Sequence, residues 1–128
     1  MDPISDMLIA IKNASAAKKE TAAFPYSKVK HSILECLEKQ GFIKQVSKKS
    51  QKGFPILEVL FSYENNMPRI HDVKRISKSS TRIYKSVKEL RPIKQGRGAL
   101  VLSTPKGILI DKEAKKEHVG GEALFEIW

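Results

Sequence analysis

Two hydroxyl groups, one ammonium group and one glycine fall within five positions of the segment 103–107, Ser-Thr-Pro-Lys-Gly. Hydroxyls both donate and accept hydrogen bonds, so Ser103 and Thr104 could bind a base edge or a ribose 2′-hydroxyl. Lys106 supplies the positive charge, and Gly107 would let backbone N–H groups approach a phosphate or sugar closely. The segment is therefore predicted to be an RNA-binding loop; the alternative is an ordinary polar turn.

A second candidate for RNA recognition is the segment Gly120-Gly121-Glu122. Its two glycines permit either a positive φ or a close approach to a partner. Glu122 is unusual in a basic protein because a carboxylate repels phosphate, yet it accepts hydrogen bonds from base amino and imino groups. The pattern predicts base readout by Glu122; the alternative is a hairpin turn followed by a solvated strand residue.

Three further residues are candidates for nucleic-acid contacts. Lys28 and Lys30 open a predicted helix, where the helix dipole disfavours cations, so a phosphate held between them and the helix N-terminus would explain their position. Tyr84 lies between an apolar and a basic residue and could stack on a base or a sugar. The alternatives are solvated surface lysines and a core tyrosine.

Signatures of catalysis and cofactor binding are scarce. The sequence has no G-x-x-x-x-G-K-[ST] segment, and its three histidines lack the spacing of a metal site or a catalytic triad. The lone Cys36 can form no internal disulfide and is expected to be a small buried side chain on a helix. An S-x-x-K match leaves one alternative, a hydrolase with Ser103 as nucleophile and Lys106 as its activator. We predict no catalytic residue, no metal, no cofactor and no enzyme activity.

The charge of the chain favours a polyanionic partner. The 128 residues carry a formal net charge of +10, with 24 Lys+Arg against 14 Asp+Glu, although a basic surface could also serve solubility alone. Ten of the bases but only two acids lie within residues 67–98, with apolar residues between them. No apolar run approaches the roughly 20 residues of a membrane span, so no membrane partner is expected. An acidic residue before any base at the N-terminus argues against a secretory signal, and we expect a cytoplasmic protein.

The helices and strands that position these residues are predicted from the spacing of apolar residues and from the residue types that begin and end such elements. Helices are expected from Pro3, preceded by Asp2 as cap, and between a cap at Ser27 and a stop at Gly41. A short helix is expected from a cap at Asp111 to Lys116. Extended segments are expected at 21–26, 42–49, 56–63, 69–77, 82–84, 98–102 and 122–128.

This order predicts an α+β fold with antiparallel strand pairing. The turn-rich tetrad Asn65-Asn66-Met67-Pro68, where the charge density also changes, is the best boundary. We predict an N-terminal α-β-α-β-β domain, residues 1–66, packed on a C-terminal, mainly antiparallel β domain with one short helix, residues 67–128.

Several short segments occur in the chain in an order that is typical of a known protein family. They are DPISDML at 2–8, NA at 13–14, SKVK at 27–30, GFI at 41–43, KRISK at 74–78, RIY at 82–84, STPKG at 103–107, DKEA at 111–114 and GGE at 120–122. From residue 2 to residue 128, the chain resembles the bacterial small-subunit ribosomal protein eight family. The resemblance implies the same two-domain α+β fold.

The resemblance also implies partners and contact residues. The family is a primary binder of a stem in the central domain of small-subunit rRNA, helps nucleate subunit assembly and contacts neighbouring ribosomal proteins, including protein five. In some bacteria it represses its own operon through an mRNA mimic of the rRNA site. We therefore expect a ribosomal location and a monomer outside the ribosome. The resemblance places one RNA-binding element at Ser103, Thr104 and Gly107, and a second at residues 120–122. Lys28 and Lys30 match the basic start of a helix in the family's N-terminal domain. Three more matching positions lie nearer the RNA, namely Arg75, Arg82 and Tyr84.

Three positions depart from the family pattern. Pro105 stands where the family commonly has Ser, Ser79-Ser80 replaces a Pro-Gly turn, and Arg97 replaces an apolar residue between two glycines. Pro105 lacks the hydroxyl with which the family residue contacts RNA, so base readout is expected to differ there. Ser79-Ser80 is expected to change the conformation of the turn. From the residues alone, a DNA-binding architectural protein remains a further alternative; it would require no Glu122.

Overall fold

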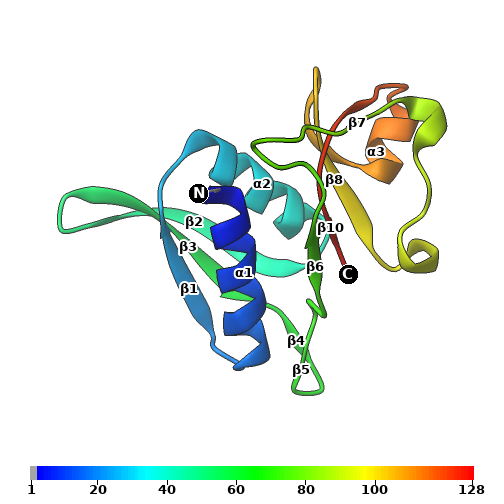
Figure 1. The fold of residues 1–128 in the computed structure, drawn as a ribbon. Helices are drawn as coiled ribbons and strands as arrows, with labels where there is room; N and C mark the ends of the chain where they lie inside the picture. Colours follow the sequence, from blue (N-terminus) through cyan, green and yellow to red (C-terminus); the bar gives the residue numbers. More distant parts are fainter. Residues whose placement is uncertain (1–2) are drawn as a thin grey trace. The chain divides into compact units, whose positions relative to one another are not determined.

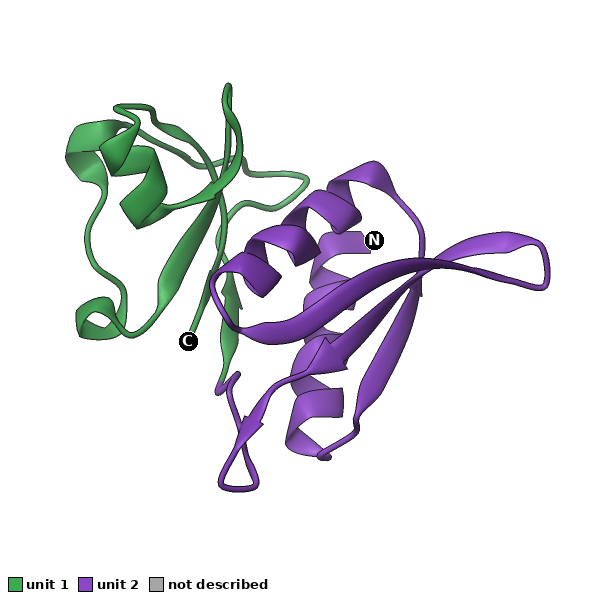
Figure 2. Ribbon diagram, turned by 180° about the vertical axis from the view of Figure 1, so that it is seen from behind, with its two compact units in different colours: residues 1–2, 72–128 green, residues 3–71 purple. Residues whose placement is uncertain are grey.

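The computed structural model describes residues 3–128, and it is a mixed α+β protein with antiparallel sheets (Figure 1). The described residues divide into two compact units, residues 3–71 and residues 72–128, coloured separately in Figure 2. The fold class predicted from the sequence is confirmed. The domain boundary after Asn66 stays a prediction.

The unit of residues 3–71 has the predicted α-β-α-β-β order. It contains α1 (Pro3–Ala16), β1 (Thr21–Pro25), α2 (Lys28–Lys39), β2 (Ile43–Gln51) and β3 (Phe54–Phe61), with β3 between β1 and β2 in an antiparallel sheet. Both helices lie on one face of this sheet (Figure 1). Alternate β3 residues Leu57, Val59 and Phe61 are buried, as expected for a strand with one face on a core.

The two helices form where the apolar spacing and the caps predict them. Met7, Leu8 and Ile11 of α1 are buried, whereas the predicted cap Asp2 lies outside the described residues. The Ser27 hydroxyl accepts a hydrogen bond from the Lys30 backbone N–H at 3.1 Å and so caps α2. Gly41, with φ +82°, follows the end of the helix, as predicted. Cys36 is buried on α2, as expected.

Two tight hairpins complete this unit. The turn Lys52-Gly53 joins β2 to β3, and both residues have positive φ, as type I′ hairpin turns require. A second pair of positive φ values, at Asn65 and Asn66, joins β4 (Tyr63–Glu64) to β5 (Met67–Pro68). The turn-rich tetrad therefore supplies the turn and the second strand of a small β-hairpin.

The unit of residues 72–128 is an antiparallel sheet with one short α-helix. Its strands are β6 (Val73–Arg75), β7 (Tyr84–Lys85), β8 (Ala99–Thr104), β9 (Gly107–Ile110) and β10 (Gly121–Ile127). The order is β6-β10-β8-β9, and β7 also pairs with β10. The helix α3 (Asp111–Lys116) packs on β8, and the 3₁₀ turns η1 (Val87–Glu89) and η2 (Lys94–Gly96) lie between β7 and β8. One core cluster contains Leu90, Leu100, Leu102, Ala114 and Ala123.

Three local expectations in this unit are wrong. The segment 69–77 is a strand only at Val73–Arg75. The segment 103–107, predicted as a loop, is a turn only at Pro105 and Lys106, because Ser103 and Thr104 belong to β8 and Gly107 begins β9, a strand that periodicity did not reveal. Asp111 is the first helical residue rather than the cap, since its buried carboxylate accepts a hydrogen bond from the Leu100 backbone N–H at 3.1 Å.

Candidate nucleic-acid interface

A row of polar and aromatic side chains crosses three neighbouring strands of the second unit. Tyr84 on β7 is directly opposite Glu122 on β10, and Glu122 is directly opposite Ser103 on β8. Directly opposite residues of an antiparallel pair lie on the same face, with Cβ atoms about 5 Å apart. We call Tyr84, Glu122 and Ser103 the exposed row. Tyr84 is 68% exposed, so the core alternative for this residue is wrong.

An ion pair anchors the centre of the exposed row. The Nη1 atom of Arg82 lies 3.0 Å from Oε2 of Glu122. The Glu122 side chain is only 16% exposed, whereas Arg82 is 53% exposed. The carboxylate therefore holds a largely solvated guanidinium beside Tyr84, and a guanidinium carries five N–H donors, so others remain for a ligand.

The hairpin at 103–107 uses its two hydroxyls differently. The Thr104 hydroxyl donates to the Gly107 carbonyl at 2.8 Å and accepts from the Lys106 N–H at 3.1 Å, so it closes the turn. The Ser103 hydroxyl is exposed and has no hydrogen-bond partner among residues 3–128. Ser103 is thus the hydroxyl of this segment that is available to a ligand.

Lys106 forms an ion pair with a carboxylate rather than a contact with the nearby serine. Its Nζ atom lies 3.2 Å from Oε2 of Glu117. A serine hydrolase of this kind needs the amine beside the nucleophile. The ion pair leaves Ser103 without its proposed activator and removes the support for the hydrolase alternative.

The two glycines before Glu122 are explained by the packing of the chain's own backbone. Neither has a positive φ. A Cβ on Gly120 would lie less than 3.0 Å from the Lys85 carbonyl oxygen, and a Cβ on Gly121 would lie less than 3.0 Å from that of Ser103. The close approach that was predicted between these glycines and a partner molecule exists, but it is to the backbone of the neighbouring strands β7 and β8. Gly121 already belongs to β10, so this strand begins one residue before its predicted start at Glu122.

Ser77, which lies in the KRISK segment but was not predicted as a site residue, positions Arg82 and Tyr84. Its fully buried hydroxyl accepts from the Ile83 N–H at 2.9 Å and donates to the Ile83 carbonyl at 3.2 Å. The Ser79-Ser80 turn forms between Lys78 and Thr81, whose backbones exchange hydrogen bonds at 2.8 and 3.0 Å. A lone Ser in a basic segment carries no signal of such a role.

After β7, the chain is fixed by a second local contact. A Glu89 carboxylate oxygen accepts a hydrogen bond from the Ser86 N–H at 3.0 Å. This backbone hydrogen bond lowers the pKa of Glu89, because it favours the charged carboxylate. Both ends of β7 are therefore held by side-chain contacts to the backbone.

We expect Ser77→Ala to lower the free energy of unfolding by about 1–3 kcal/mol, since the half-buried Ile83 N–H would lose its acceptor. Urea denaturation followed by circular dichroism measures the change. Ser79→Ala is the matched control, because Ser79 is exposed in the adjoining turn. Equal stability of the two variants would contradict the bridging role of Ser77.

The remaining predicted residues are not part of the exposed row. Lys28 and Lys30 lie at the start of α2 in the other unit; Lys28 is exposed and Lys30 is half-buried. The Arg75 guanidinium donates to the Leu124 carbonyl, within the irregular part of β10. Arg75 therefore has a structural contact that the sequence did not predict.

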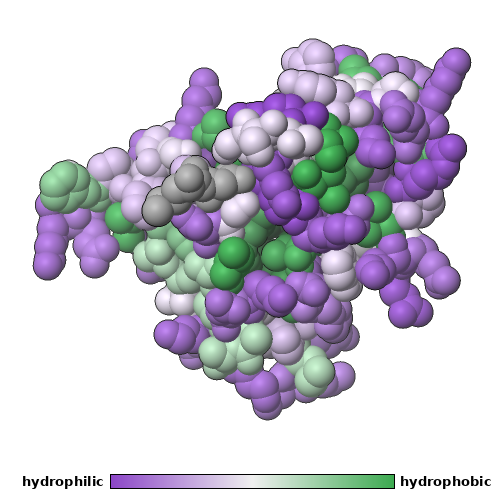
Figure 3. All heavy atoms as spheres, in the orientation of Figure 1, coloured by the Kyte–Doolittle hydropathy of each residue, from purple (hydrophilic) through white to green (hydrophobic). Residues whose placement is uncertain are grey.

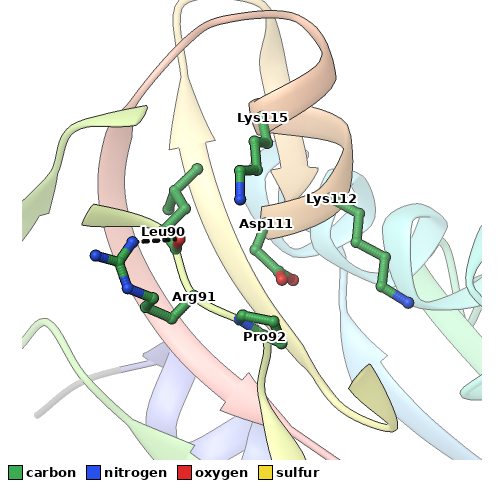
Figure 4. A pocket seen from close by; sticks show the side chains of 6 residues that line it. All are labelled: Leu90, Arg91, Pro92, Asp111, Lys112 and Lys115. Atoms are coloured by element: carbon green, nitrogen blue, oxygen red, sulfur yellow. Dashed lines mark hydrogen bonds between the residues drawn. The ribbon is translucent and has the colours of Figure 1, made fainter. Parts of the chain in front are cut away.

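A shallow cavity of about 100 Å³ lies between the start of α3 and the segment Leu90–Pro92 (Figure 4). Its other lining residues are Asp111, Lys112 and Lys115, and its surface is mainly apolar. None of the residues predicted to bind RNA lines it. Within the described part of the chain, no cluster of three or more possible metal ligands occurs, and no helix is long and apolar enough to cross a membrane.

Comparison with known proteins gives one consistent result. The family model described as "Ribosomal protein S8" matches residues 2–128. A small ribosomal subunit protein uS8 of Mycoplasmopsis agalactiae is 43% identical over 127 residues, covering 99% of this chain and 97% of the relative. The uS8 protein of Caulobacter sp. is 41% identical over 128 residues, covering 99% of this chain and 97% of the relative. That of Thermus thermophilus is 42% identical over 135 residues, covering 99% and 98%.

Proposed function

This chain belongs to the ribosomal protein S8 family, and on that basis we propose that it binds small-subunit rRNA through the exposed row and Arg82. As a member, it is a structural, non-enzymatic component of the small ribosomal subunit. The observation that carries the proposal is the register that aligns Tyr84, Glu122 and Ser103 across β7, β10 and β8.

The chemistry of the exposed row fits an irregular RNA stem. Tyr84 offers an exposed ring on which an unstacked base or a sugar can stack. The Ser103 hydroxyl can donate to and accept from a base edge or a ribose 2′-hydroxyl. Arg82, held by Glu122, presents its free N–H donors to a phosphate, and the remaining lone pairs of the carboxylate can accept from a base amino group.

The net charge of +10 provides the attraction that does not depend on sequence. Lysine and arginine contacts release counterions from RNA, so this part of the affinity falls as salt rises. The short-range contacts of the exposed row then discriminate between RNAs. Thr104 and Gly107 shape the 103–107 hairpin, and Gly120 and Gly121 let the strands approach each other. We propose that the backbones of these four residues also contact RNA, and that Lys106 contacts a phosphate.

The family membership supports finer proposals about partners. We propose that the RNA is a stem of the central domain, that binding nucleates assembly of that domain, and that protein five is a neighbour. Binding to the chain's own operon mRNA, a monomeric state outside the ribosome and a cytoplasmic location complete the proposal. In an order-of-addition reconstitution, early addition of the chain should accelerate uptake of neighbouring proteins by the central domain. An unchanged uptake rate would contradict the assembly role.

We expect the double variant Lys28→Ala with Lys30→Ala to flatten the dependence of log affinity on log salt by about one to two units, one for each phosphate that is no longer neutralised. A filter-binding titration at several salt concentrations measures the slope. The double variant Lys19→Ala with Lys44→Ala removes the same charge elsewhere in the same unit and is the control. Equal slopes for both double variants would contradict phosphate contacts by Lys28 and Lys30 and would favour the alternative, solvated surface lysines.

A further inference from the structure

The β2–β3 hairpin carries an exposed aromatic side chain at its free end. All eight residues from Lys48 to Pro55 are exposed. Phe54 is 72% exposed, the highest value among the large exposed hydrophobic side chains of the described residues. Figure 3 shows a hydrophobic group at the free end of this hairpin, with hydrophilic side chains beside it.

The fold does not require an aromatic residue at position 54. The turn is set by the positive φ values of Lys52 and Gly53, and Phe54 pairs with Gln51 immediately after it. The buried side of β3 consists of Leu57, Val59 and Phe61, two residues apart, and Phe54 points to the opposite face of the strand. Packing therefore does not explain this side chain.

The end of the hairpin that carries Phe54 has a positive charge. Residues 48–55 contain three lysines and no acidic residue. Lys49 is neutralised by Glu58, whose Oε1 atom lies 2.7 Å from its Nζ atom. Lys48 is directly opposite Leu57 and so lies on the other face of the hairpin from Phe54, over the Tyr26 ring at 4.2 Å from the ring centroid. Lys52, at the turn, is exposed and lies two residues before Phe54.

We propose that the β2–β3 hairpin is a second RNA-binding element, in which Phe54 stacks on an unpaired base and Lys52 binds an adjoining phosphate. An exposed ring beside a positively charged side chain is the combination with which proteins bind single-stranded nucleic acid irrespective of sequence. Charge complementarity favours RNA over a neutral or basic protein surface. The inference rests on the proposed function, because it requires an rRNA partner, but it uses none of the residues of the exposed row.

The test compares Phe54→Ala with the matched control Met67→Ala, which shortens another exposed apolar side chain, at 59%, on the β4–β5 hairpin of the same unit. The ligand is a transcript of the whole rRNA central domain. We expect Phe54→Ala to weaken binding about 5- to 150-fold, the range for loss of one stacked base. Met67→Ala and Phe54→Trp should bind like the wild type, and thermal unfolding should be unchanged for all three.

A photocrosslinking arm identifies the class of partner. With p-azidophenylalanine introduced at position 54, irradiation within reconstituted subunits should link the chain to rRNA. A crosslink to a ribosomal protein, or an affinity of Phe54→Ala equal to that of Met67→Ala, would overturn this inference while stem binding through the exposed row stands. Failure of the wild-type chain to bind either the stem or the transcript would overturn the proposed function and this inference together.

Discussion

Glu122→Ala is expected to weaken binding to the cognate RNA stem by about 1–3 kcal/mol, the scale of one good base contact. The variant loses the carboxylate that holds Arg82 at 3.0 Å and, with it, an acceptor for a base amino group. Binding to non-cognate RNA should be unchanged or slightly tighter, because a negative charge is removed from a basic protein. Parallel filter-binding titrations of the two RNAs measure both effects.

A double-mutant cycle separates the two roles of Glu122. If Glu122 acts only by positioning Arg82, then the variants Glu122→Ala, Arg82→Ala and the double variant should lose similar amounts of binding free energy. If Glu122 also contacts a base, the double variant should lose more than Arg82→Ala alone. Cognate affinity unaffected by Glu122→Ala would contradict both roles.

Gly121→Ala is expected to have the largest effect on stability, lowering the free energy of unfolding by about 3 kcal/mol, the upper part of the range for steric overpacking. The new Cβ would lie less than 3.0 Å from the Ser103 carbonyl oxygen, and a backbone oxygen within a paired strand cannot move aside as a flexible side chain can. Urea denaturation measures the loss. Because Ser103 belongs to the exposed row, cognate RNA binding should weaken as well.

Gly53→Ala is the control for this substitution. Gly53 has φ +83° and no atom within 4 Å of an added Cβ, so the variant incurs only the strain of a left-handed conformation, about 1–2 kcal/mol. A smaller loss for Gly121→Ala than for Gly53→Ala would show that β10 does not approach β8 as closely as described.

The sequence predicts best those parts of the fold that depend on local signals. The helix α2 begins at its Ser27 cap and ends before Gly41 because both signals lie within the helix ends themselves. The strands β2 and β3 are expected from alternation and β-branched residues, and both extend up to the Lys52-Gly53 turn. The buried run of β8 is expected from its continuous apolar residues. The strand β9 escapes prediction because four residues between a turn and a helix are too few to show a period.

The geometry of the candidate site depends on pairing between residues far apart in the chain. Tyr84, Ser103 and Glu122 are each candidates from the sequence, but only the strand register places them side by side. Residue types alone do not show that the Thr104 hydroxyl closes its own turn or that Lys106 binds Glu117. The role of Ser77 escapes prediction for a different reason: its partner, Ile83, is only six residues away, but the residue types do not show how the turn between them folds.

The most direct test of RNA recognition is a filter-binding titration across a salt series with three ligands: the native central-domain stem, a scrambled stem and the matching DNA duplex. We predict that the native stem binds at least roughly a thousandfold more tightly than the other two, by analogy with specific protein–DNA complexes. We also predict that this preference persists as salt rises, because only the shared phosphate contacts weaken. Equal and steeply salt-dependent binding of all three ligands would contradict specific RNA recognition and favour a general nucleic-acid-binding role.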